Sequence, residues 1–496
     1  MKRGRKILVV LALSFVFLLV YSPHFNYSFP YHVDEWHHLS ESIRLGNYGE
    51  YLDAFRAGTA RGFSGLEIGF HFALFLLSFL VNLISVYQFL PAIFAVLGAL
   101  ALFYLVYRKT DGNFWLGFFA IIFFASIKSN VNVTGLWFFT PMTFSIPLIF
   151  LYFYFFDQGV GQQKPKSLLI SFGLMTVLLF VHSVSFIFSL PALIIYSLLN
   201  HQFLLKEYKL FLVPLAVLVL GVLFYKYALD IPNFLLASRV LSDLQFEYGW
   251  GIVELKNSLL EVYSTVGYLL AALGMVFAVF KLKALKKYLL FLLWPATLII
   301  MIIIFRISGV SYLSPYQRNL YYLVISLPLF SALGLYYSLL LVKGWLVQSK
   351  VYIFIRGKQI YLSSLLIFLL GLVAILFAFV SYYKMPESVK LYEAINQDDY
   401  QALIFLAGLP KTTVMAPSDV SEGIYPITGH QPVGTLVFYG NRLVVEKFYG
   451  IRNCQEKESI LNYRRVAYVM SERSIGCGWE LIYHESNRYI YRYKIL

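Results

Sequence analysis

The chain has 496 residues, of which 59% are hydrophobic and only 13% charged, and its mean hydropathy is +0.70. Apolar runs recur until about residue 383, more than any soluble core needs, so the composition excludes a soluble protein and predicts a multi-pass membrane protein. The net charge is +14. It can be used to infer binding partners only after the charged residues have been assigned to the two sides of the membrane.

Four basic residues lie among the first six and precede an apolar run over 7–21. The following Tyr21-Ser22-Pro23-His24 offers no small-residue cleavage site, so we predict an uncleaved anchor with a cytoplasmic N-terminus. Ten further apolar runs are long enough to cross the bilayer. They cover 86–107, 114–127, 142–156, 167–182, 184–200, 210–229, 258–280, 287–305, 320–342 and 361–383.

The run 66–82 is ambiguous, and the distribution of charge decides its place. If it lies along the outer surface, the N-terminus and alternate connections hold 18 Lys and Arg residues but three acidic ones. The opposite side then holds 9 basic and 11 acidic residues. This matches the positive-inside rule, so we predict eleven spans and an interfacial helix at 66–82. The basic surface is then a topology signal, and no nucleic-acid partner is expected.

In this topology the outer side holds the first loop (22–85), the shorter connections 128–141, 182–183, 230–257 and 306–319, and the tail. The first outer loop, 22–85, carries a predicted amphipathic helix over 34–45, which Gly46 ends. The fold class is therefore mainly α, with a transmembrane domain over 1–383 in the cell membrane. An extracytoplasmic α/β domain is expected over 384–496, where charged residues and glycines become frequent.

Within that tail we expect a helix at 399–408 and four strands. The strands cover Thr412–Ala416, Val466–Met470, Glu480–His484 and Arg488–Ile495. The chain's two cysteines, Cys454 and Cys477, lie there. An oxidising compartment favours a disulfide between them, whereas two unpaired core cysteines are the alternative.

Asp34 and Glu35 stand at the start of the helix in the first outer loop. Acidic residues in a first turn often only cap the helix and complement its dipole. At the edge of a membrane, however, a carboxylate can also accept a proton from a hydroxyl or hold a divalent metal ion. Both interpretations stay open at this point.

Several other polar residues are candidates for substrate binding. His37 and His38 are adjacent and point about 100° apart on a helix, so they lack the i, i+4 spacing of a zincin motif. His182 stands at the outer end of an apolar helix. The alternative to substrate binding is that it is simply a hydrated polar residue that caps this helix at the membrane boundary. Arg318 begins a span after Ser-Pro-Tyr-Gln, and its planar guanidinium suits a phosphate, although arginines there also contact lipid headgroups.

This pattern resembles the GT-C superfamily of membrane glycosyltransferases, which includes protein O-mannosyltransferases, aminoarabinose transferases and oligosaccharyltransferases. The matching features are Asp34-Glu35 after one span, the interfacial run 66–82, and Arg318 at the start of a late span. The small outer tail is similar to that of prokaryotic and archaeal members. Two departures exist: loop 128–141 has no acidic residue, and the tail lacks a Trp-Trp-Asp motif.

The resemblance implies inverting transfer of a sugar from a polyprenyl-phosphate-linked donor to a hydroxyl of a lipid, glycan or protein. It implies that Asp34 takes the acceptor proton and that Glu35 orients Asp34 or a divalent metal. Arg318 stabilises the leaving phosphate, with His37 and His182 near the donor head group. The alternative is a non-catalytic protein of glycan assembly, either a flippase or exporter or a degenerate GT-C scaffold subunit.

Overall fold

A computed structural model describes residues 3–47, 67–129, 135–214, 262–280, 282–346, 358–379, 393–436 and 442–494, together with 49, 216, 219–220, 223, 245–246, 260 and 352–355. The chain divides into two compact units. The first comprises Met1–Pro23 and Phe89–Pro386, and the second comprises His24–Gln88 and Glu387–Leu496. The predicted boundary between 383 and 384 lies outside the described residues.

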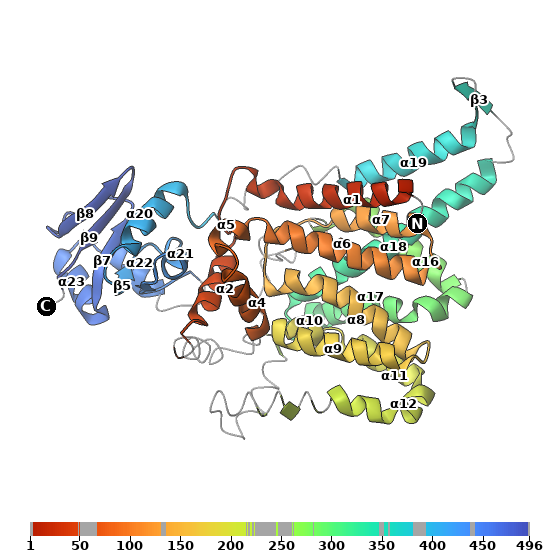
Figure 1. Cartoon of the computed structure of the whole chain (residues 1–496), viewed down its shortest axis with the longest axis horizontal. Coiled ribbons are helices and arrows are strands. Elements are labelled where there is room, and N and C mark those ends of the chain that lie inside the picture. The colour runs from red at the N-terminus through yellow and green to blue at the C-terminus, as the bar shows by residue number, and fades with distance from the viewer. Residues whose placement is uncertain are drawn as a thin grey trace. The chain divides into compact units, whose positions relative to one another are not determined.

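The first unit is a bundle of apolar helices (Figure 1). A helix lies at every expected span except 210–229, most of which falls outside the described residues. The helices are α1 (Arg3–Tyr21), α6 (Leu90–Lys109), α7 (Phe114–Ala125), α8 (Pro141–Val160), α9 (Pro165–Val181), α10 (Val184–Ile187), α11 (Leu190–Leu199), α12 (His201–Lys206), α16 (Thr265–Phe280), α17 (Leu282–Ser308), α18 (Tyr316–Leu346) and α19 (Leu362–Phe379).

Five helical stretches in the described part of the chain are long and apolar enough to cross a membrane. They are Arg3–Phe25, Leu90–Lys109, Pro141–Val160, Leu285–Ser308 and Tyr316–Trp345. At the other expected spans that the structure describes, the apolar helical stretches have 10 to 17 residues: Phe114–Ala125, Pro165–Val181, Val184–Leu199, Thr265–Phe280 and Leu365–Phe379. The structure therefore supports a polytopic membrane protein, while the count of eleven spans stays a prediction.

An ion pair explains why two helices extend beyond their predicted ends. Apolar runs were expected to stop at 107 and 156, but α6 reaches Lys109 and α8 reaches Val160. Lys109 Nζ lies 2.5 Å from Asp157 Oδ2, and Tyr196 donates to the other oxygen at 2.9 Å. Because these partners satisfy the buried charges, the helices continue past the first charged residues.

Two glycines let α16 and α18 approach at backbone contact. A methyl group added at Gly274 would lie 1.9 Å from the carbonyl oxygen of Phe330. One added at Gly334 would lie 1.9 Å from the carbonyl oxygen of Leu270. Small residues at such crossings allow the two helix backbones to come into contact. This arrangement is common where membrane helices pack against each other.

The second unit combines the first outer loop with the tail. The loop contributes η1 (Ser22–Phe25, which begins two residues before this unit), α2 (Val33–Arg44), α4 (Ile68–Ser78) and α5 (Leu83–Tyr87). Helix α2 confirms the helix expected over 34–45. Helix α4 has 11 residues, about 16 Å at 1.5 Å per residue, which is short of the roughly 30 Å hydrocarbon core.

A five-stranded sheet with order β6-β5-β7-β9-β8 forms the tail. Strands β6, β5 and β7 are parallel, and β9 pairs antiparallel with both β7 and β8. The strands are β5 (Thr413–Met415), β6 (Gln431–Pro432), β7 (Val466–Ser471), β8 (Glu480–Glu485) and β9 (Arg488–Arg492). The helices are α20 (Gln397–Ala407), α21 (Ser421–Thr428), α22 (Arg442–Gly450) and α23 (Cys454–Arg464). All four expected strands and the helix at 399–408 are present.

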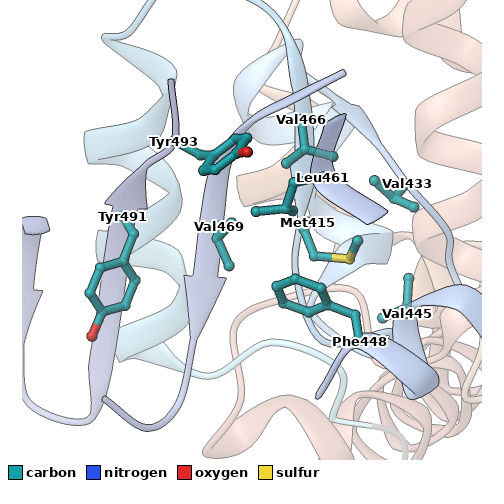
Figure 2. Packing of buried hydrophobic residues seen from close by; sticks show 9 residues of the cluster. All are labelled: Met415, Val433, Val445, Phe448, Leu461, Val466, Val469, Tyr491 and Tyr493. Atoms are coloured by element: carbon teal, nitrogen blue, oxygen red, sulfur yellow. The ribbon is translucent and has the colours of Figure 1, made fainter. Parts of the chain in front are cut away.

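The core of the tail lies between this sheet and helices α22 and α23 (Figure 2). Phe448 and Leu461, from these helices, are fully buried together with Met415 and Val469 of the strands. Cys454 and Cys477 form a disulfide with their Cα atoms 5.4 Å apart. The structure thus selects the disulfide over two unpaired cysteines.

Candidate active site

Helix α2 begins in a capping box built from an unusual residue. His32 is the N-cap, and its Nδ1 accepts a hydrogen bond from the amide of Asp34 at 3.1 Å. In return Glu35 Oε2 accepts the amides of His32, at 2.8 Å, and of Tyr31, at 2.6 Å. These contacts satisfy amides that a helix N-terminus leaves without intrahelical partners. The capping interpretation therefore holds for Glu35, which is fully buried.

Asp34 is presented differently from its neighbour. Its side chain is 24% exposed, and its Oδ2 lies 3.5 Å from His32 Nδ1. Because that nitrogen accepts the Asp34 amide, the ring proton of neutral His32 sits on Nε2. Asp34 therefore keeps a carboxylate that reaches solvent, at the positive end of the helix dipole. Tyr87 of α5 interacts electrostatically with both acidic residues.

The other end of α2 is fixed to the tail. The Arg44 guanidinium stacks 3.6 Å above the ring of Tyr425 in α21 and donates to Gln431 Oε1 at 2.9 Å. Its Nε lies 3.7 Å from Glu41 Oε1. Burial raises the pKa of Glu41 to about 7, against the opposing effect of Arg44. These contacts hold the helix that carries Asp34 against the sheet domain.

Three histidines gather on α2 and α4. The rings of His37 and His38 are 5.3 Å apart, as are those of His38 and His71. Burial lowers the pKa of His37 to about 4, although Asp34 raises it. His37 is therefore neutral at physiological pH, and as a substrate ligand it would act through hydrogen bonds and not through charge.

One set of metal-ligand atoms converges in the described part of the chain. One ring nitrogen each of His38 and His71 and a carboxylate oxygen of Glu67 lie within 4.8 Å of one another. This set was not predicted from the sequence, because Glu67 and His71 lie about thirty residues beyond His38. Their own spacing of four, which puts both on one helix face, was a usable signal.

A metal ion at the Asp34-Glu35 dipeptide stays a prediction. One oxygen of Glu35 is already committed to two amides. Such an ion would therefore rest on Asp34 and the second oxygen of Glu35.

His182 and Arg318 lie in the first unit and interact with each other electrostatically. His182 ends α9, and its Nδ1 lies 2.7 Å from Ser185 Oγ, which is 2.8 Å from the Tyr322 hydroxyl. Arg318 and Tyr322 are one helical turn apart on α18 and share a face. Buried Asn319 donates to Ser311 Oγ at 3.1 Å and so fixes the loop before this helix.

The predicted residues thus fall into two groups. Asp34, Glu35 and His37 share α2 in the second unit, and His182 and Arg318 share the first unit.

Comparison with solved structures shows that this fold is similar to those of an archaeal oligosaccharyltransferase and of ArnT. The oligosaccharyltransferase AglB from Archaeoglobus fulgidus, in complex with an inhibitory peptide and a dolichol-phosphate, matches with a TM-score of 0.59 and 14% identity over 95% of this chain and 69% of its own. The same organism's enzyme in complex with Zn and sulfate has a TM-score of 0.57 and 12% identity over 94% and 68%. ArnT from Cupriavidus metallidurans in the apo state gives a TM-score of 0.50 and 12% identity over 98% and 97%. Neither family models nor curated protein sequences match the chain.

Proposed function

We propose that this protein is a membrane glycosyltransferase that moves a sugar from a polyprenyl-phosphate-linked donor to an acceptor hydroxyl, with inversion. The observation that carries the proposal is the presentation of Asp34, a solvent-reaching carboxylate on a rigidly capped helix. The fold is shared with oligosaccharyltransferase and ArnT structures, one of which holds dolichol-phosphate. These neighbours support the general activity, and the donor and stereochemistry belong to the proposal.

In the proposed reaction the acceptor oxygen attacks the anomeric carbon as the bond between that carbon and the phosphate oxygen breaks. Asp34 takes the proton of the acceptor hydroxyl, and the polyprenyl phosphate leaves with the electron pair of the broken bond. A positioned general base contributes roughly 10²- to 10⁴-fold to such a step. Asp34 stands in the first turn of α2, where a negative charge is favourable to the helix dipole.

Glu35 has a positioning role in this proposal. Its carboxylate fixes the turn at residues 31–32 through two amides, and this turn sets the direction of the first helical residues. The neighbouring Asp34 carboxylate is thereby held in place, so little conformational entropy is lost when it reaches the reactive geometry. The chemistry does not require a bond between the two acidic side chains.

Arg318 and His182 would act on the donor. A guanidinium binds phosphate through two parallel hydrogen bonds and stabilises the charge that grows as the phosphate leaves. The pair with His182 and the fixed loop at Asn319 support a constrained position for Arg318. His37 is proposed as a neutral hydrogen-bonding group for the sugar.

The protein is proposed to lie in the cell membrane with a cytoplasmic N-terminus and an extracytoplasmic tail. The disulfide between Cys454 and Cys477 supports this orientation, because such bonds persist in oxidising compartments. The acceptor class, whether lipid, glycan or protein, is left to experiment.

Asp34→Asn is the direct test, and α20 offers a matched control. Asp398 holds the same second position of a helix with its own capping box, from Asn396 to Asp399. Both substitutions remove one acidic residue from a first turn, which costs about 0.3–1 kcal/mol through the helix dipole.

Purified protein would be incubated with radiolabelled lipid-phosphate sugars and membrane acceptors, and transfer would be counted. We expect Asp34→Asn to lose at least about 100-fold in rate and Asp398→Asn to retain the wild-type rate. A folded Asp34→Asn protein that transfers sugar normally would exclude the general-base role. A wild-type protein inactive with every donor would favour the scaffold or exporter alternative.

A further inference from the structure

A second cluster of polar side chains lies one turn beyond Asp34. His38 Nδ1 on α2 is 3.0 Å from His71 Nε2 on α4 and 3.8 Å from Glu67 Oε2. Glu67 is the N-cap of α4, and His71 follows four residues later on the same helix face. The three potential ligand atoms lie within 4.8 Å of one another.

We propose that His38, Glu67 and His71 bind one zinc ion, which joins α2 to α4. Zinc takes imidazole nitrogen and carboxylate oxygen at about 2.0–2.2 Å, usually in tetrahedral geometry. Such bonds place neighbouring ligand atoms about 3.3 Å apart. The distances from His38 Nδ1 to His71 Nε2 and to Glu67 Oε2, 3.0 and 3.8 Å, lie on either side of that value. Small side-chain movements would therefore complete the coordination.

The donor set selects the ion. Two imidazoles favour zinc and neighbouring transition metals over Ca²⁺ and Mg²⁺, which prefer an all-oxygen set. Two histidines and one glutamate also leave a fourth position for water.

Burial distinguishes this cluster from histidines that meet at a surface. His38 and His71 are 6% and 5% exposed, while the Glu67 side chain keeps 19% of its surface. The ion can thus enter past Glu67 and then lie against two ordered rings. In the metal-free protein one of the facing nitrogens donates its proton to the other, and zinc would replace that proton.

A zinc ion at this site would help to hold α2, the helix that carries Asp34. Helices α2 and α4 pack against each other within the second unit. A zinc ion at His38 would fix the middle of α2, four residues from Asp34, while Arg44 fixes its end. The ion is assigned a structural role, and no step of the sugar transfer depends on it.

Zinc binding by the full-length protein tests the proposal without reference to activity. Protein purified in detergent with a histidine-free tag would be dialysed against a chelator. It would then be titrated with zinc against a chromophoric competitor, and bound metal would be counted by mass spectrometry. We expect one zinc per chain, with an excess of Ca²⁺ or Mg²⁺ unable to displace it.

Glu67→Gln is the main variant, because it preserves the shape of a partly exposed side chain and should fold. It and His71→Asn should weaken zinc binding by at least about 100-fold, more than the loss of an outer-shell partner typically costs. His484→Asn, which removes an exposed histidine from β8, should bind zinc normally. Asp34→Asn should also bind normally, because the site does not use that carboxylate.

Two results would overturn the assignment. One is wild-type protein that retains no stoichiometric zinc. The other is a Glu67→Gln protein that binds zinc as tightly as the wild type, which would place the metal elsewhere.

Discussion

Arg44 offers the sharpest test of how the helix bearing Asp34 is held. We consider Arg44→Met, which keeps most of the side-chain volume and removes the charge. The change removes the stack on Tyr425, the hydrogen bond to Gln431 and the ion pair with Glu41. A buried, desolvated stack contributes about 2 kcal/mol, and a charged hydrogen bond about 1.5–3 kcal/mol.

The remaining term is the charge of Glu41. Breaking a buried ion pair usually costs about 3–5 kcal/mol, because the surviving partner stays charged. Glu41 can avoid that cost, since burial already raises its pKa to about 7 and loss of Arg44 would raise it further. It would then be protonated at neutral pH. We therefore expect a total loss near 3 kcal/mol, the lower end of that range.

Hydrogen exchange of the full chain in detergent would measure this loss. A reduction of about 3 kcal/mol in the free energy of opening speeds exchange of the α2 amides by about 150-fold. Arg442→Met is the matched control, because Arg442 pairs with Glu446 at 2.6 Å on an exposed helix face. That pair should contribute less than about 0.5 kcal/mol. Exchange of α2 at the wild-type rate in Arg44→Met would refute the anchoring role.

Three further predictions follow from other contacts. Glu41 has a folded pKa of about 7 against 4.5 for the free group, so the folded state holds the extra proton, and stability is lost as pH rises. Between pH 6.5 and 8 Glu41 itself accounts for a loss of about 0.8 kcal/mol, or roughly a fourfold effect on corrected exchange of α2. Glu41→Gln should remove this contribution, and a pH dependence equal to that of the wild type would exclude Glu41 as its source. Gly274→Ala should destabilise the helix bundle by at least about 2 kcal/mol in thermal melts. Gly173→Ala is the control and should be neutral, because a methyl group added there would have nothing within 4 Å. Equal melting temperatures of the two variants would contradict the close crossing of α16 and α18. Replacing Cys454 and Cys477 by alanine opens a loop with a sequence separation of 23. This should lower the free energy of unfolding of the tail by about 3 kcal/mol, measured by denaturant unfolding. An unchanged denaturation midpoint would show that other contacts already constrain this loop.

His37 titrates in part of the same pH window. Burial lowers its pKa from 6.5 to about 4, so its contribution to stability is complete only well above pH 6.5 and is lost as pH falls toward 4. Between pH 6.5 and 8 the end of this titration raises stability by about 0.4 kcal/mol, which offsets about half of the loss due to Glu41. The effect of Glu41 is therefore measured as the difference between the wild type and Glu41→Gln.

Local periodicity and charge distribution predicted much of the fold. The helix over 34–45 and the strands of the tail came from alternating or helical patterns that short segments carry by themselves. The short α22 and α23 had no such pattern strong enough to predict them. The ends of α6 and α8 were placed too early, because the pairing of Lys109 with Asp157 joins residues 48 positions apart.

The candidate site shows the same division. Asp34 and Glu35 were proposed as site residues from their position, and Arg318 and His182 from their place at helix ends. The cluster of His38, Glu67 and His71 was not predicted, since it depends on the packing of α2 against α4. Sequence spacing also left the role of Glu35 undecided. The two amides that it accepts become visible only when the turn before α2 is formed.

The union of an early loop with the tail has a consequence for biosynthesis. Tyr27 donates to the carbonyl of Ile395, and Arg44 donates to Gln431, 387 residues later. At a translation rate of about 5–20 residues per second, α2 waits roughly 20–80 s for the segment that completes its anchor. During that interval the Arg44 guanidinium has neither Tyr425 nor Gln431. The helix that carries Asp34 is thus among the first parts of the protein to be synthesised and among the last to gain its final contacts, so an interrupted chain would carry Asp34 without that support.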